Sequence, residues 1–155
     1  MFGYVNRDFI RSHEFKSDGL FIEQEKASKR ISPNAVLPDM PEKKQVQLRK
    51  RLNSLLFEKL DGNSARIESA CGVSWELVRK YMSGTRKVTR DSLAKLCVGM
   101  RLTVEEAQQL FQLQGNSLEP DINLLDAIVV DVLKCGEDIS VFYAECEEFG
   151  LSLFR

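Results

Sequence analysis

The segment SARIESACGVSWELVRKYMSG, residues 64–84, contains two short amphipathic patterns that meet at a glycine. Gly72 stands where the chain must turn sharply, and a residue that is free to adopt positive φ is favoured at such a position. The second pattern starts at Ser74, whose hydroxyl can accept from a free backbone N–H group of the first helical turn. Gly84 ends it. The segment therefore predicts a short helix, a tight turn and a second short helix.

The second of these helices, residues 74–83, has one apolar and one polar face. Leu77, Val78 and Tyr81 recur at steps of three and four residues and so form one stripe. The other side chains of this helix are offered outward: Trp75, Glu76, Arg79, Lys80 and Ser83. The chain after it adds further polar and basic residues: Thr85, Arg86, Lys87 and Arg90. This cluster is placed to meet phosphate groups.

Residues 46–114 resemble the lambda-repressor-like helix-turn-helix family, also called the XRE or Cro type. The motif positions that suit this family are Ile67, Cys71, Gly72, Val78 and Tyr81. Val88 stands where the loop after the second motif helix usually has proline. Glu68 stands where the family usually has a small alanine, which predicts a wider crossing of the two helices. GTRKVTRDSLAKLC followed by LTVEEAQQLF is similar to XRE-type regulators with extra C-terminal helices, which extends the resemblance to Phe154.

The resemblance implies a sequence-specific, DNA-binding transcriptional regulator whose helix 74–83 lies in the major groove. Base contacts are then expected from Trp75, Glu76 and Lys80, with Arg79 beside them. Lys80 would donate to guanine, Glu76 would accept from cytosine, and Trp75 would contact a thymine methyl group. Contacts to phosphates are expected from Ser64, Ser83, Thr85, Arg86 and Arg90. We expect a homodimer that binds a two-part operator in double-stranded DNA.

Helical patterns continue on both sides of this motif and predict an all-α protein. Five helices are expected in a DNA-binding domain at 43–115: 45–60, 64–71, 74–83, 89–99 and 103–114. The last of them starts with Thr103 and Glu106 at capping-box spacing. Residues 116–155 form an acidic C-terminal helical pair, with helices expected from Asp121 to Lys134 and from about Asp138 to Gly150.

The helix 121–134 is apolar almost all round, more than one neighbouring helix can cover. We therefore expect part of it to pack against a second chain, so that residues 116–155 act as an oligomerisation unit. A β-strand at 128–132 is the alternative, because β-branched residues favour strands. A single strand without a partner is not viable, and no second strand pattern is present.

The net charge of −1 hides two segments of opposite sign. Residues 43–101 contain fourteen Lys and Arg against five Asp and Glu, whereas residues 102–155 contain two against eleven. Such asymmetry suits a basic module that faces DNA and an acidic part that faces elsewhere. The alternative is that the two parts simply attract each other.

Residues 1–42 predict an irregular arm. Five of the twelve Phe and Tyr residues of the chain recur here without a helical or alternating period: Phe2, Tyr4, Phe9, Phe15 and Phe21. This is too many aromatic side chains for a wholly solvated tail. We expect the arm to pack on its own chain, and the alternative is a protein partner that binds through it.

Several classes of function are not expected. The four cysteines form no C-x-x-C pair and the single histidine is His13, so we expect no metal site and no cofactor. No catalytic set and no glycine-rich phosphate loop is present, which argues against an enzyme. No apolar run is long enough to span a bilayer, and the N-terminus lacks the pattern of a secretion signal, so a cytoplasmic protein without membrane contact is expected. The alternative functions are a protein-interaction adaptor and an antitoxin-like protein, each with the helix-turn-helix as a scaffold.

Overall fold

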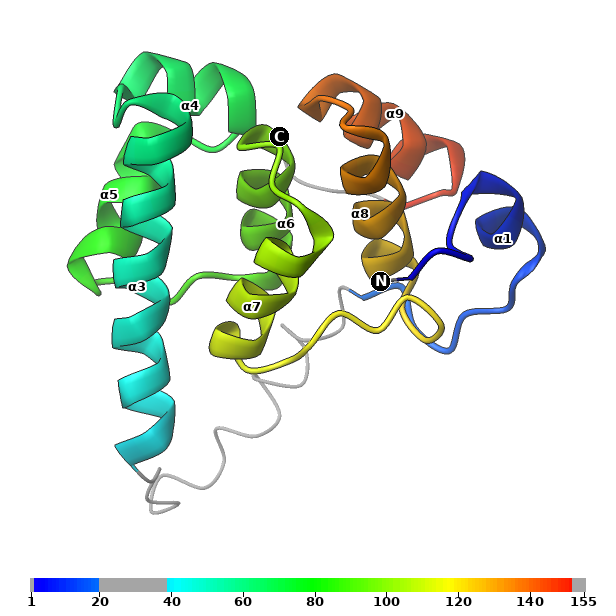
Figure 1. Ribbon diagram of the computed structural model, residues 1–155, viewed down its shortest axis with the longest axis horizontal. Coiled ribbons are helices and arrows are strands. Elements are labelled where there is room, and N and C mark those ends of the chain that lie inside the picture. Colours follow the sequence, from blue (N-terminus) through cyan, green and yellow to red (C-terminus); the bar gives the residue numbers. More distant parts are fainter. Residues whose placement is uncertain (1, 20–38, 152–155) are drawn as a thin grey trace.

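The structure, a computed structural model, describes residues 2–19 and 39–151, with side chains from residue 43 onward in the second range. These residues form eight α-helices (Figure 1): α1 (Arg7–Ser12), α3 (Asp39–Leu60), α4 (Ser64–Cys71), α5 (Trp75–Ser83), α6 (Arg90–Gly99), α7 (Val104–Gln114), α8 (Leu124–Cys135) and α9 (Ile139–Glu148). The all-α class is confirmed. The strand alternative for residues 128–132 is wrong, because they lie within α8. Phe21 and Phe154 lie outside the described residues.

Side-chain caps set where most helices begin. Thr103 and Glu106 form the predicted capping box at the start of α7. Ser74 caps α5, and Thr89 caps α6 in the same way. The hydroxyl oxygens of Ser74, Thr89 and Thr103 each accept from a backbone N–H group that has no partner within the first turn of the helix. α3 starts at Asp39, earlier than the predicted residue 45, because a proline such as Pro41 is tolerated in a first helical turn, where no N–H partner is needed.

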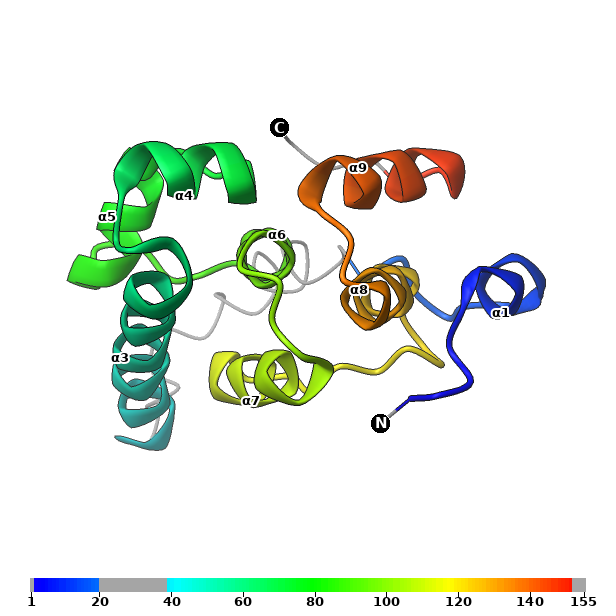
Figure 2. The ribbon, with the colours of Figure 1, turned by 45° about the horizontal axis from the view of Figure 1, so that its top comes forward.

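α6 lies at the centre of the helix packing (Figure 2). It contacts α4, α7, α8 and α9, and its residues 92–98 are all buried. α3 packs on α7, α5 and α4 at one side of the molecule. One continuous core therefore joins the segment 43–115 to the segment 116–151. Within the described ranges, no helix combines the length and the apolar character needed to cross a bilayer.

α8 is buried on every side within its own chain. Its residues 125–133 are all buried, including Asp126 and Asp131, and the helix contacts α1, α6, α7 and α9. The apolar excess that the sequence shows is therefore covered by helices of the same molecule. The prediction that this excess is buried against a second chain is wrong, because α1 covers the remaining face of α8. No pattern in the sequence indicates this contact.

The N-terminal segment 2–19 packs along α8. Val5 and Ile10 enter the core, and the Lys134 ammonium donates to three backbone carbonyls of the segment at 2.6–3.1 Å. Ser17 forms an isolated parallel bridge with Asn123. The prediction of an irregular arm is wrong for part of this segment, because residues 7–12 form the short helix α1, which begins at the Asn6 side-chain cap.

Candidate nucleic-acid interface

The turn between α4 and α5 holds the N-terminus of α5 with two acceptors. Gly72 adopts φ of 69°, in the left-handed region that favours glycine. The Ser74 hydroxyl accepts from the Leu77 backbone N–H group at 3.2 Å, and the Glu68 carboxylate accepts from the Trp75 N–H group at 2.7 Å. The Glu68 side chain is exposed and is used as a cap for the following helix.

α5 presents the two faces that its sequence predicts. Val78 and Tyr81 are buried, and the Tyr81 hydroxyl donates to Ser92 Oγ at 2.9 Å. On the outer face Glu76, Arg79 and Lys80 are exposed. This face is therefore free to meet a partner while the inner face holds the helix on the core.

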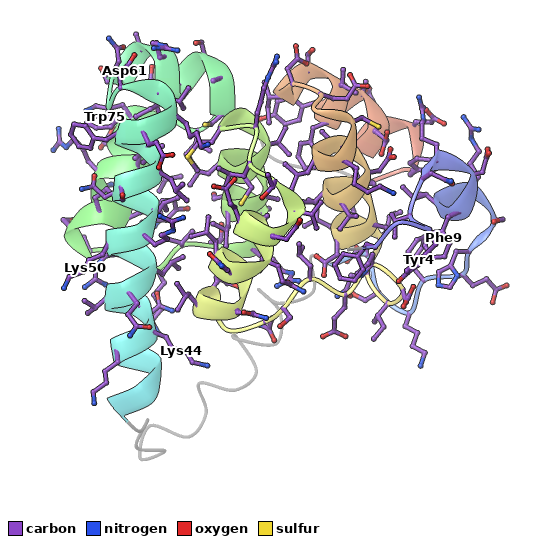
Figure 3. All side chains as sticks on the ribbon, in the orientation of Figure 1. Tyr4, Phe9, Lys44, Lys50, Asp61 and Trp75 are labelled. Atoms are coloured by element: carbon purple, nitrogen blue, oxygen red, sulfur yellow. The ribbon has the colours of Figure 1, made fainter. Side chains whose placement is uncertain are left out.

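Two outer residues of α5 have further contacts. Lys80 Nζ lies 3.7 Å from Glu76 Oε1, one helical turn away, so these two side chains partly neutralise each other. Trp75 is half-buried and packs against the core with part of its ring. In Figure 3 Trp75 and Lys50 lie at the same edge of the molecule, which α3 and α5 form.

The chain that follows α5 gathers hydroxyls and cations. Ser83, Thr85, Arg86 and Lys87 are all exposed, and Ser83 Oγ lies 2.8 Å from Thr85 Oγ1. The turn here needs Gly84, whose φ is 80°. The arrangement offers hydrogen-bond donors and positive charge together, which is the chemistry that binds phosphate.

Arg49 of α3 joins this group, although it is distant from α5 in sequence. Its guanidinium carbon would lie 3.2 Å from a Cβ atom built on Gly84. The charge pattern of residues 45–60 places Arg49 on the polar side of its helix, which is a signal that it is accessible. The direction in which that side faces depends on how α3 packs on α5, which no local pattern contains.

Arg90 does not belong to this surface. It is 4% exposed, and its guanidinium nitrogens lie 2.5 Å and 3.2 Å from the Asp126 carboxylate oxygens. It also donates to the backbone carbonyls of Asn116 and Ser117 and lies over the Phe111 ring. The predicted phosphate contact of Arg90 is therefore wrong. Its side chain points inward, because α6 begins against α8 and the loop before it, and it links these elements.

Ser64 is exposed as the first residue of α4, next to the Asn63 side chain that caps this helix. Close to it, Arg66 forms an ion pair with Asp61. The N-terminus of α4 therefore offers a hydroxyl beside a neutralised charge pair. This is a weaker anion site than the chain after α5, where Arg86 and Lys87 are exposed.

The basic charge of the segment 43–101 stays accessible. Of its fourteen Lys and Arg residues, only Arg90 and Lys95 are buried in the described structure. Arg79 is exposed on α5, and Arg86 and Lys87 are exposed on the loop that follows it in the chain. Mutual attraction between the basic and acidic segments therefore leaves much of the positive charge open to solvent.

The cysteines of this region are buried within the core. Cys71 of α4 and Cys97 of α6 are both without exposure, and burial raises the pKa of the Cys71 thiol to about 12. Burial also raises the pKa of Cys97, with the neighbouring Cys71 thiol as a further cause. Both thiols are protonated at neutral pH and pack as small apolar groups.

Comparisons with models of protein families, with curated proteins and with solved structures returned no match to this chain.

Proposed function

We propose that this chain is a sequence-specific DNA-binding regulator that inserts α5 into the major groove. The observation that carries the proposal is the exposed group of hydroxyls and cations on α5 and the chain after it: Arg79, Lys80, Ser83, Thr85, Arg86 and Lys87. The helix that holds the first part of this group, α5, is capped by Ser74 and Glu68 and is attached to the core by Val78 and Tyr81. A rigid helix with a polar, mostly basic outer face fits direct readout of base edges.

The proposal gives the residues different tasks. Lys80, Glu76 and Trp75 lie on the first two turns of α5 and would meet base edges. Arg86, with the Ser83 and Thr85 hydroxyls, would bind the phosphate backbone. Arg49 of α3 would add a phosphate contact next to Gly84. In this proposal the lambda-repressor-like arrangement comprises α3 to α7, and a homodimer would occupy a two-part operator.

A protein-interaction adaptor is the second candidate, because two large apolar side chains of α3 and α5 are at least partly accessible. Phe57 of α3 is 62% exposed, and Trp75 is half-buried. Exposed aromatic side chains are enriched in protein interfaces. The Glu76 carboxylate also favours a protein over a phosphate backbone, because an acid close to phosphates costs Coulomb energy.

The test is a titration of the purified full-length chain against duplex DNA from its own promoter region at several salt concentrations. Release of counterions predicts that log K falls linearly with log salt, with a slope of about −0.9 for each phosphate contact. We expect a slope of roughly −3.6 to −5.4 for each bound chain, from four to six cationic contacts. An affinity that does not depend on salt, or no binding at low salt, rejects the DNA proposal.

Variants separate the two kinds of contact. Arg86→Ala should weaken binding to all sequences equally. It should also make the salt slope shallower by about 0.9 for each bound chain, because one phosphate contact is lost. Lys80→Ala should also relax the preference at one base pair, by roughly 1–3 kcal/mol. Lys16→Ala, which removes one exposed charge from the arm, is the matched control and should change neither quantity. If Arg86→Ala and Lys80→Ala act identically, Lys80 does not contact bases.

A further inference from the structure

Tyr143 of α9 lies directly against the turn between α4 and α5. A Cβ atom built on Gly72 would overlap the Tyr143 hydroxyl and would lie 3.3 Å from Cζ and 3.4 Å from Cε2 of the ring. Gly72 is therefore needed for two reasons, its positive φ and the space that the tyrosine occupies. A side chain of the C-terminal helical pair thus touches the backbone that sets the angle between α4 and α5.

The C-terminal end of α4 is also held from a second direction. A Cβ atom built on Gly99 of α6 would overlap Cys71 Sγ and lie 2.6 Å from the Ala70 carbonyl oxygen. Figure 2 shows α4 and α9 on the same side of α6. The end of α4 is therefore confined between α6 and α9, which leaves little room for the turn to move without a change in one of these helices.

The position of Tyr143 is set by the rest of α9. Phe142 and Cys146 are buried and attach α9 to the core. Lys95 Nζ of α6 lies 5.8 Å from the centre of the Tyr143 ring. On the other side of the helix, Arg7 and Arg11 of the N-terminal segment form ion pairs with Glu148. Tyr143 is therefore held against Gly72 by a helix that is attached both to the core and to the N-terminal segment.

We propose that Tyr143 is a positioning residue for the DNA-binding helix, through its contact with Gly72. This inference rests on the proposed function. Side chains that recognise a ligand must be held to within about 0.5 Å of the productive geometry, and their supports must be rigid. Trp75 and Glu76, at the start of α5, follow the turn that Tyr143 contacts. The acidic C-terminal segment would then adjust sequence preference without contacting DNA itself.

The test is a double-mutant cycle of Gly72→Ala and Tyr143→Phe in the full chain, with affinity for promoter DNA and for unrelated DNA as readouts. Gly72→Ala and the double variant carry the same strain from positive φ at residue 72. Subtracting the effect of Tyr143→Phe alone from the difference between these two variants therefore isolates the contact between the introduced methyl group and the tyrosine hydroxyl. We expect Gly72→Ala to weaken promoter binding by about tenfold, and the double variant to regain at least about threefold. Binding to unrelated DNA should change by less than about twofold, since the phosphate contacts remain.

Tyr4→Phe is the control. Tyr4 lies in the N-terminal segment and its hydroxyl donates to Asp121 in the loop before α8, so this variant should leave both affinities unchanged. Affinities are measured at a temperature below the midpoint of thermal unfolding of every variant. The proposal is overturned if the double variant binds as weakly as Gly72→Ala, or if promoter and unrelated DNA lose affinity equally. A wild-type chain that binds no DNA would overturn the proposed function as well, so the two failures are distinct.

Discussion

Glu145 is a carboxyl group whose surroundings favour its neutral form. It is 3% exposed on α9, next to the buried Asp131 of α8, and its Oε1 atom lies 3.7 Å from Arg7 Nε. Burial, followed by the hydrogen bond and negative charge of Asp131, raises the pKa of Glu145 to about 8, although Arg7 opposes this shift. At neutral pH the folded protein therefore keeps a proton on the Glu145 carboxyl group.

The buried proton makes stability depend on pH. Because its pKa is higher in the folded chain, Glu145 contributes stability that is complete below its ordinary pKa of 4.5 and is lost as pH rises through about 8. We expect wild type to lose roughly 2–4 kcal/mol of unfolding free energy between pH 5 and pH 8 from this group. Glu145→Gln, which stays neutral and can donate to Asp131, should remove most of this loss in urea unfolding measured across that range.

Glu147→Gln is the matched control for this prediction. Glu147 is exposed on the same helix and is not among the groups that shift the pKa of Glu145, so its neutralisation removes a surface charge and leaves the buried pair unchanged. Its pH profile should keep the slope of wild type. If Glu145→Gln keeps that slope too, the proton is not held at this pair.

At the scale of elements, α1 is a helix that depends on its neighbours. Six residues are too few to form a stable helix in water, so α1 exists because Ile10 and Val5 pack on α8. Ile10→Asp should therefore destabilise the chain by about 3 kcal/mol, since it places an unpaired charge in an apolar site. Thermal unfolding measures this loss, and light scattering should detect self-association through the uncovered face of α8.

Ser12→Asp adds the same charge to an exposed position of α1 and is the control. It should cost less than about 0.5 kcal/mol, as most surface substitutions do. Equal stability of the Ile10 and Ser12 variants would show that the arm adds nothing to the fold.

The elements show which parts of the fold local sequence can predict. The caps at Ser74 and Thr103 were predicted because a cap is formed by residues a few positions apart. α1 was missed because six residues give no measurable period. Arg90 was placed on the wrong side for a related reason. Its position after a basic loop suggests a phosphate contact, whereas its real partner, Asp126, lies on a helix that only the tertiary fold brings close.

The same limit applies to the candidate site. The outer face of α5 follows from the spacing of Val78 and Tyr81, and the structure places its polar side chains as expected. Arg49 beside Gly84 and Tyr143 beside Gly72 were not predicted. Both contacts join segments that are distant in sequence. Local patterns in a single sequence do not indicate which distant residues come together.

At the scale of the whole molecule, the basic and acidic segments share one core. α8 packs on both α6 and α7, and the buried ion pair of Arg90 with Asp126 joins the two segments. Breaking a buried pair by removing one partner typically costs about 3–5 kcal/mol, because the other charge is left without compensation. The C-terminal helices are therefore part of the structure that supports the proposed DNA-binding surface.

This shared core predicts a single unfolding transition. In scanning calorimetry the full chain should give one peak, with a calorimetric enthalpy equal to the van't Hoff enthalpy. A chain that ends at residue 118 lacks α8 and α9 and exposes the buried face of α6, so it should unfold at a much lower temperature or fail to fold cooperatively. Two peaks for the full chain, or a truncated chain that keeps the full-length midpoint, would show instead that residues 43–118 fold independently and that Tyr143 and Asp126 contact a domain that does not need them.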